Sequence, residues 1–276
     1  MIAFFHGRVK RGWAAFLSGA TRAGGLECAM YSPGPEIAWA FRSAARDYRW
    51  LLDRGYAESA ALKLVGDRFQ LPREERLVLF RGVAPSLAAA SRRALLRGDA
   101  AGRTLLVDGH NQALAVMHYL AGRPVFVASD GYLRDAGGSH GRIPRPELFD
   151  RALGLLAASV ASAWPSRVLA FFDSPIPKSA AHAAAFREAL ARLGVEVESG
   201  TENDADAPLK AAPACGVVAT SDSAVLDSLV SGGERPGTFD AARAAVDALR
   251  ALSGEAVAPW FDLGRELGDG AQNEVT

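Results

Sequence analysis

The sequence has few cysteines, no long hydrophobic run and no net charge, and each of these features narrows what the protein can be. Its two cysteines, Cys28 and Cys215, cannot form a disulfide framework, and no CxxC or Cys/His cluster offers a zinc site. No apolar run approaches the roughly 18 residues of a membrane span. We therefore expect a globular protein of the reducing cytoplasm, without structural zinc and without a membrane partner.

Two common nucleotide-binding motifs are also missing. The chain has neither a GxxxxGK[ST] loop nor a GxGxxG fingerprint, so it shows no sign of a P-loop or a dinucleotide-binding site. No Ser-His-Asp arrangement is apparent either. Any chemistry must therefore come from other groups.

The zero net charge of the whole chain hides two parts of opposite sign. Residues 1–103 hold 17 basic and 9 acidic side chains, whereas the remainder holds 14 basic and 22 acidic ones. A basic part can meet a polyanion, and an acidic part can hold cations. The asymmetry also fits a solvated helical surface followed by ordinary surface carboxylates, so charge alone leaves both interpretations open.

The first third of the chain has a helical pattern. We assign residues 1–34 to an extension, because its apolar stretch is too interrupted for a signal peptide, and Met30 is a second candidate start besides Met1. In residues 35–103 apolar side chains recur at helical spacing, and no strand is evident. Pro72 followed by two acids is typical of a helix start. This part is expected to be a small helical domain.

From residue 104 onward, short and wholly apolar segments alternate with helical ones. Strands are predicted at 104–108, 124–128, 167–172, 195–197 and 216–220. Such strands are typical of a buried parallel sheet covered by helices on both faces. The predicted α/β domain spans residues 104–255, and residues 256–276 form a tail that is expected to be frayed from Leu263.

Acidic residues follow these strands at their carboxyl ends. They are Asp108, Asp173, Asp204, Asp206 and Asp222. Because parallel strands end at one edge of a sheet, the pattern predicts four or five carboxylates in a small volume. Such carboxylates raise one another's pKa unless a cation neutralises them, and ligation by oxygen alone favours Mg²⁺ or Mn²⁺. Such an ion would activate water for attack on a phosphodiester.

Each acid also has a simpler interpretation. An aspartate between a strand and a helix is a favoured N-terminal cap, because it accepts hydrogen bonds from unpaired backbone N–H groups. For any single acid, capping and catalysis are about equally good explanations. Their coincidence at successive strand ends favours a shared function for the set.

Two short motifs resemble those of the PIN-like nuclease superfamily, including its NYN branch. Val107-Asp-Gly-His-Asn111 is similar to the VDGxN motif of the first NYN strand. Thr220-Ser-Asp-Ser-Ala-Val-Leu-Asp227 is similar to the TxDxxxL motif that follows a late PIN strand. The resemblance implies that Asp108 and Asp222 are metal ligands and that Asn111 positions the loop.

The other acids fit the same resemblance. Asp204-Ala-Asp206, before a helix, is similar to the acidic helix start that supplies an intermediate ligand, and Phe172-Asp-Ser174 is similar to the second-strand acid. The implied catalytic residues are Asp108, Asp173, Asp206 and Asp222. The implied ligands of Mg²⁺ or Mn²⁺ are Asp108, Asp204, Asp206 and Asp222.

Roughly residues 35–255 are similar to an uncharacterised prokaryotic family that joins an N-terminal helical domain to a PIN-like domain. The resemblance implies an α/β fold class, with a three-layer parallel-sheet PIN-like domain preceded by a small all-helical domain. It implies a ribonuclease, with RNA favoured over DNA as the partner. Whether the protein is a homodimer, or is held in check by a regulatory partner, stays open.

Substrate contacts are expected from two further groups of residues. PIN domains usually carry another acid on a helix between the first and middle strands, and none stands out here. A loop with Asp130 and Arg134 could instead line the cleft or clamp a phosphate, or be a surface turn. Together with Asn111 and Ser221, the expected substrate-binding residues include Arg46 and Arg49 of the helical part, assisted by Arg92, Arg93 and Arg97. His110 and His140 are candidates for proton transfer.

Two other functions remain open from the sequence. A degenerate PIN-like module would bind RNA or a protein without cleaving, and would need no divalent ion. A phosphotransferase or phosphatase of the haloacid-dehalogenase type requires Asp-x-Asp after its first strand, whereas this chain has Asp108-Gly-His. The nuclease is therefore the leading hypothesis.

Overall fold

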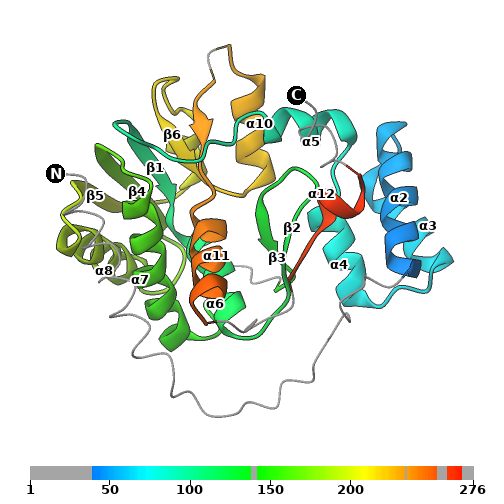
Figure 1. Cartoon of the computed structure of the whole chain (residues 1–276), viewed down its shortest axis with the longest axis horizontal. Coiled ribbons are helices and arrows are strands. Elements are labelled where there is room, and N and C mark those ends of the chain that lie inside the picture. The colour runs from blue at the N-terminus through cyan, green and yellow to red at the C-terminus, as the bar shows by residue number, and fades with distance from the viewer. Residues whose placement is uncertain (1–38, 138–141, 234, 254–259, 269–276) are drawn as a thin grey trace.

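The computed structural model describes residues 39–137, 142–233, 235–253 and 260–268 (Figure 1). The extension 1–34 and His140 lie outside these residues. The predicted fold class is confirmed: the chain is α/β, with a five-stranded parallel sheet flanked by helices and a helical segment before it. No helix of the described part is long and apolar enough to cross a membrane.

The larger sheet is parallel throughout and has the strand order β5-β4-β1-β6-β7. Its strands are β1 (Thr104–Asp108), β4 (Arg167–Asp173), β5 (Val197–Glu202), β6 (Val217–Ala219) and β7 (Gly237–Thr238). Strand β1 lies at the centre, between β4, which ends at Asp173, and β6, which is followed by Asp222. The order therefore brings these acids towards the end of β1.

Helices cover both faces of this sheet (Figure 1). The first face is covered by α6 (Gly109–Leu120), α7 (Pro146–Ser162), α8 (Ser179–Arg192) and α11 (Ala241–Ser253), and the second by α9 (Asp206–Lys210) and α10 (Ser223–Ser231). Successive residues of a strand point to opposite faces. Accordingly, Leu105 and Val107 pack under the first set of helices, whereas Leu106 packs under the second. The alternation makes three layers.

A second, three-stranded sheet has the order β3-β2-β8. It consists of β2 (Val125–Val127), β3 (Leu133–Asp135) and β8 (Trp260–Asp262), followed by α12 (Leu263–Glu266). The sequence pattern placed the strand at 124–128 in the main sheet, which is wrong, because β2 pairs with β3 and β8 instead. Residues 260–262 of the expected tail form β8, and the fraying expected from Leu263 is wrong for α12.

The helical segment packs on this second sheet. It contains α2 (Trp39–Asp53), α3 (Glu58–Arg68), α4 (Arg73–Gly82) and α5 (Ser86–Arg93). Its core continues into the second sheet through Phe126 and into α12 through Leu263. The contact is close at Gly82, where an added Cβ would lie 2.4 Å from Leu263 and 2.7 Å from Phe126. The second sheet therefore joins the helical segment to the α/β part.

Strand β5 begins where the predicted strand ended. The sequence pattern indicated residues 195–197, whereas the observed strand runs from Val197 to Glu202. This is an edge strand, and most of its side chains are exposed. Exposed strands need no apolar run, so hydrophobicity alone marked only their first residue.

Candidate active site

All five predicted acids lie at or beyond the carboxyl edge of the larger sheet. Asp108 ends β1, and Asp173 ends β4. Asp204 and Asp206 follow β5, and Asp222 follows β6. The parallel register sets the end of β1 beside β4, and the end of β4 beside β5. The fold therefore places these carboxylates along one edge, as the sequence pattern predicted.

Asp108 lies at the centre of this edge and is 4% exposed. Its Oδ2 accepts a hydrogen bond of 2.9 Å from the Thr220 hydroxyl, and its Oδ1 accepts from the Asn111 N–H at 3.4 Å. Burial raises the pKa of Asp108 to about 8, against the lowering effect of the Thr220 hydrogen bond. The negative charges of Asp206, Asp222 and Asp173 raise it further. These carboxylates therefore form one electrostatically coupled group.

Asp222 caps helix α10. Its Oδ1 accepts from the N–H groups of Ala224 at 2.8 Å and Val225 at 3.1 Å. The capping interpretation is therefore correct for Asp222, but it uses a single oxygen. Oδ2 makes no hydrogen bond to any residue in the described part of the chain, and can serve a second role.

Asp204 is hydrogen-bonded to Asp206, and Asp206 forms an ion pair with a lysine. Asp204 Oδ1 accepts from the Asp206 N–H at 3.1 Å, and Asp206 Oδ2 lies 3.0 Å from Lys210 Nζ. The pKa of Lys210 is raised, first by its hydrogen bond to Asp206 and also by the charges of Asp204 and Asp222. An ammonium group therefore lies beside the acidic edge. Sequence reasoning missed it, although it follows Asp206 by one helical turn.

The carboxylates do not enclose an ion as they stand. Within the described residues, no three His, Cys, Asp or Glu side chains lie close enough together to hold a metal. The donor chemistry nevertheless fits a hard divalent cation, because the coupled groups are all carboxylates. The buried, uncompensated Asp108 also has the electrostatic character of a cation site. An ion would require the flanking carboxylates to turn towards Asp108.

Asn111 and Ser221 hold two loops of the edge together. The Asn111 Oδ1 accepts from the Ser221 hydroxyl at 2.9 Å and from the Ser221 N–H at 3.3 Å. Gln112 also donates to the Ser221 hydroxyl at 3.3 Å, and its own carbonyl accepts from Ala242 N–H at 2.8 Å. Ser221 is 6% exposed. These contacts fit the expected loop-positioning role of Asn111, and they occupy the two groups that we had expected to bind substrate.

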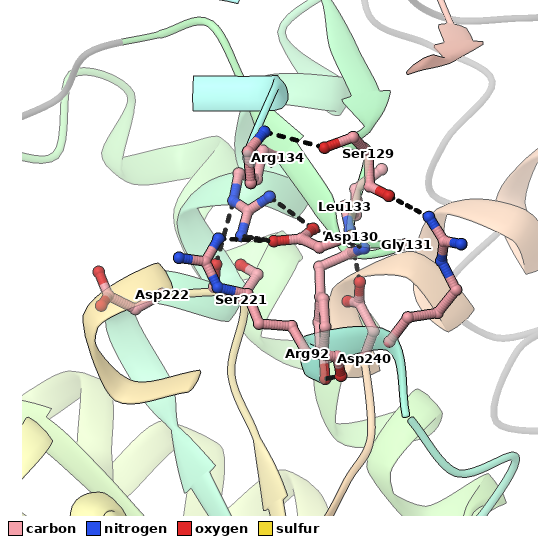
Figure 2. A network of polar contacts seen from close by, with 12 residues as sticks. Arg92, Ser129, Asp130, Gly131, Leu133, Arg134, Ser221, Asp222 and Asp240 are labelled. Atoms are coloured by element: carbon pink, nitrogen blue, oxygen red, sulfur yellow. Dashed lines mark hydrogen bonds and ion pairs between the residues drawn. The ribbon is translucent and has the colours of Figure 1, made fainter. Parts of the chain in front are cut away.

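Asp130 and Arg134 lie in a buried ion cluster (Figure 2). Arg134 binds Asp130 through two hydrogen bonds of 2.7 and 2.8 Å, and Arg92 adds a third at 3.0 Å. Asp130 is fully buried, and Arg134 is 7% exposed. Our expectation that these two residues bind substrate is therefore revised, because they are hydrogen-bonded to each other and both are buried.

This cluster reaches the acidic edge through the backbone. Arg134 Nε donates to the Ser221 carbonyl at 3.2 Å, next to Asp222 in the chain, whereas the Asp222 side chain itself points away from the cluster (Figure 2). Arg92 also binds Asp227 on α10 with two contacts of 2.7 Å. The cluster thus ties α5, the second sheet and the loop before α10 into one unit.

The arginines of the helical segment divide into two kinds. Arg49 and Arg92 are each 8% exposed, so our expectation that they hold phosphates is wrong. Arg93 donates to the Ser129 carbonyl. Arg46 is exposed, as a phosphate-binding residue must be. The signal for Arg49 was present in the sequence, because it follows Ala45 by one helical turn on the apolar face of α2.

Three further groups at the edge were missed or only partly predicted. The Nδ1 atom of His110 accepts from the Asp173 N–H at 2.9 Å, and its Nε2 lies 3.3 Å from Nδ1 of His182, a residue that no sequence motif singled out. Asp240 follows β7 and is buried, which raises its pKa to about 6. It accepts from Leu133 N–H and Arg243 N–H, so it joins the second sheet to α11. Its strand–aspartate–helix pattern could have been recognised.

Comparison with known proteins finds similarity to regions described as having unknown function. Residues 98–232 match the family model "Domain of unknown function (DUF5616)", and residues 40–94 match "Protein of unknown function (DUF434)". An uncharacterized protein of Methanocaldococcus jannaschii is 27% identical over 187 residues, which cover 67% of this chain and 88% of that protein. No solved structure matches. The first matched region contains all five acids, and the second contains the helical segment.

Proposed function

We propose that this protein is a PIN-like, metal-dependent nuclease with RNA as its preferred substrate. The observation that carries the proposal is the buried Asp108, whose pKa is raised to about 8 beside Asp173, Asp206 and Asp222 at one sheet edge. A fold rarely keeps a buried carboxylate uncompensated among other carboxylates unless it has a use for them. The two PIN-like motifs fall on Asp108 and Asp222, which lends independent support.

The residues of the acidic edge would have different roles in binding the metal and the phosphate. Asp108, Asp206 and Asp222 would hold a Mg²⁺ or Mn²⁺ ion, which supplies charge neutralisation at the phosphate and a more acidic bound water. Asn111 and Ser221 fix the loop that carries Asp222. Asp173 is positioned by the contact of its backbone with His110. Lys210 can offer its ammonium group to a phosphate once Asp206 is engaged elsewhere.

The test replaces one carboxylate by its amide at the edge and at a matched site. Asp222→Asn keeps an N-terminal cap, since asparagine caps helices as well as aspartate does, but removes the charge. Asp262→Asn is the matched control, because Asp262 caps α12 through Arg265 N–H in the same way and is not one of the coupled acids of the edge. Both variants and Asp108→Asn are assayed for cleavage of single-stranded and structured RNA with Mn²⁺, Mg²⁺ or EDTA.

We expect cleavage by the wild type to require Mn²⁺ or Mg²⁺, and we expect Asp222→Asn and Asp108→Asn to lose more than about 100-fold in rate. Asp262→Asn should cleave like the wild type. Unfolding temperatures of Asp222→Asn and Asp262→Asn should be alike. Absence of cleavage by the wild type, with a control nuclease active in the same buffer, contradicts the proposal. Equal rates for Asp222→Asn and Asp262→Asn do so as well.

A second candidate is a non-cleaving PIN-like module that binds RNA or a protein. It is favoured by the contacts that already engage the acids, namely the cap made by Asp222 and the ion pair of Asp206 with Lys210. Such a module would retain RNA after Asp108→Asn and in EDTA, and would show no metal-dependent cleavage.

The cytoplasm remains the proposed location, where the exposed thiol of Cys215 would stay reduced.

A further inference from the structure

We infer that an exposed Trp/Arg stripe along α2 and at its carboxyl end binds single-stranded nucleic acid and leads it towards the acidic edge. The stripe consists of Trp39, Arg46, Trp50 and Arg54. This inference rests on the proposed function for its destination, but the binding surface itself is argued from α2 and its neighbours. The feature that the stripe recognises is the exposed face of an unpaired base.

Trp39, Arg46 and Trp50 share one side of the helix. Arg46 and Trp50 follow Trp39 by 7 and 11 positions, and a helix turns by about 100° per residue, so the three fall within an arc of about 40°. Arg54 is the first residue after the end of α2 and joins the stripe through its contact with the Trp50 ring. The two tryptophans are about 17 Å apart along the axis at 1.5 Å per residue. The opposite side of α2 carries Phe41, Ala45 and Leu52 into the core. The stripe is therefore the outward side of a helix that is anchored from behind.

The indole rings of this stripe are unusually open to solvent. Trp39 is 77% exposed and Trp50 is 52% exposed. Large aromatic side chains are seldom left in water without a partner, and two on one helix face indicate a binding surface. The Arg54 guanidinium lies 3.4 Å from the centre of the Trp50 ring. A stacked indole and guanidinium form a flat platform of the kind that bases stack on.

The charge of the stripe suits a polyanion. Arg46 is exposed and makes no hydrogen bond or ion pair with another residue that the structure describes. Helix α2 itself carries two acids, and both are engaged: Asp47 lies 3.8 Å from Arg68, and Asp53 accepts from Ser86 N–H at 2.6 Å and from its hydroxyl at 2.7 Å. A phosphate backbone can therefore approach Arg46 without opposing a free carboxylate.

A path leads from the stripe to the acidic edge. Helix α5 packs against both α2 and α10, and it runs between them (Figure 1). Its first residue, Ser86, binds Asp53 at the Arg54 end of the stripe, and its Arg92 binds Asp227 on α10. Helix α10 begins after Asp222. Helix α5 contains no acidic residue, so nothing on it would repel a strand that follows this path.

The chemistry favours a single strand over a duplex or a protein. Stacking on an indole needs an exposed base face, and in a duplex these faces are covered by neighbouring base pairs. A hydrophobic protein partner would account for the two tryptophans but not for Arg46 and the Trp50–Arg54 stack. Single-stranded nucleic acid would contact both the tryptophans and the arginines, because its bases stack on aromatic rings while its phosphates bind cationic side chains along the same face.

The experiment measures binding of the full chain in EDTA, where no metal-dependent cleavage can occur. The probe is a labelled single-stranded RNA of about 20 nucleotides, longer than common site sizes, and the same RNA annealed to its complement. Trp50→Ala should weaken binding of the single strand by about 5- to 100-fold, and Trp50→Phe should restore most of it. Arg46→Gln should lower the slope of log affinity against log salt by about 0.7.

Two matched controls lie away from the stripe. Trp164→Ala removes another exposed tryptophan, which precedes the amino end of β4, and Arg192→Gln removes an exposed arginine of α8. Both should bind RNA like the wild type. The inference is overturned if Trp50→Ala binds like Trp164→Ala, or if the wild type prefers the duplex. If only the nuclease proposal fails, the result is different: Trp50→Ala still binds RNA more weakly than Trp164→Ala in EDTA, but no metal produces cleavage.

Discussion

Two aspartates of this protein are both buried, but their pKa values are shifted in opposite directions. Asp108 is 4% exposed and Asp130 is 0% exposed. Burial raises the pKa of both, but Asp130 meets Arg134 and Arg92, whose charges and hydrogen bonds bring its pKa below the usual value. Asp108 meets a hydroxyl group and three further carboxylates, and its pKa is raised to about 8.

The difference separates an acid that builds the fold from one that is available for chemistry. Asp130 is compensated on all sides and joins α5, the second sheet and the Ser221 loop. Asp108 is held by two hydrogen bonds, and no cationic side chain offsets the burial that keeps it protonated up to about pH 8. Buried, uncompensated charge is tolerated where a ligand can neutralise it. The comparison therefore supports a cation site at Asp108 and a structural role for Asp130.

The largest expected effect is the loss of the buried ion cluster. Asp130→Asn should lower the free energy of unfolding by about 3–5 kcal/mol, because it leaves Arg134 buried without its counter-charge. Asp108→Asn keeps a hydrogen-bond acceptor for Thr220 and removes a penalised charge, so at pH 8 its stability should equal or exceed that of the wild type. Urea unfolding of the three proteins measures both values. Similar losses for the two variants would erase the distinction between the two aspartates.

A smaller effect should appear in the pH dependence of stability. The unfolded chain releases the Asp108 proton near pH 4, whereas the folded protein retains it until about pH 8. Stability is therefore lost as pH rises through this window, by up to about 1.4 kcal/mol per pH unit. Asp240 has a pKa of about 6, so its contribution to this loss of stability is complete at a lower pH than that of Asp108.

Unfolding of the wild type and Asp108→Asn is therefore compared at pH 6, 7 and 8, without metal. The wild type should lose about 2 kcal/mol more than the variant between the first and last of these values. Saturating Mn²⁺ should reduce that difference, because a bound cation favours the charged carboxylate. Parallel curves for the two proteins would show that Asp108 ionises normally.

The smallest expected effect concerns Lys210, whose ammonium group lies beside the acids. Lys210→Met should tighten Mn²⁺ binding by up to about 5-fold, since a partly exposed ion pair is worth at most about 1 kcal/mol. Lys63→Met is the matched control, because Lys63 pairs with Asp67 in the same i,i+4 arrangement on α3. Calorimetric titration with Mn²⁺ compares them. Weaker Mn²⁺ binding by Lys210→Met would contradict a competing role for this lysine.

Much of the fold could be predicted because local pattern and burial agree there. Residues 105–107 of strand β1 are all apolar, and helices cover them on both faces of the sheet. The second sheet could not be predicted, because three apolar residues at Val125–Val127 do not reveal which strand they pair with. Their partner at Trp260–Asp262 is more than a hundred residues away in sequence. Pairing of this kind is decided by tertiary packing.

The acids of the site were predictable for a similar reason, and their partners were not. Strand order and direction bring Asp108, Asp206 and Asp222 to one edge once the sheet is known to be parallel. Sequence cannot tell that Arg134 turns inward to Asp130, since both belong to a short segment of mixed polarity with no periodicity. It could have excluded Arg49, which lies on the apolar face of its helix.

The most direct test of the account is a crystal of the wild type soaked in Mn²⁺ and measured at a wavelength where manganese scatters anomalously. The account predicts an anomalous peak within coordination distance of the Asp108 carboxylate and of at least one of Asp206 and Asp222. The side chains of these flanking residues should have turned towards Asp108. An anomalous map with no peak at this edge, from a crystal that shows manganese elsewhere, would contradict a metal-dependent site at the centre of the sheet.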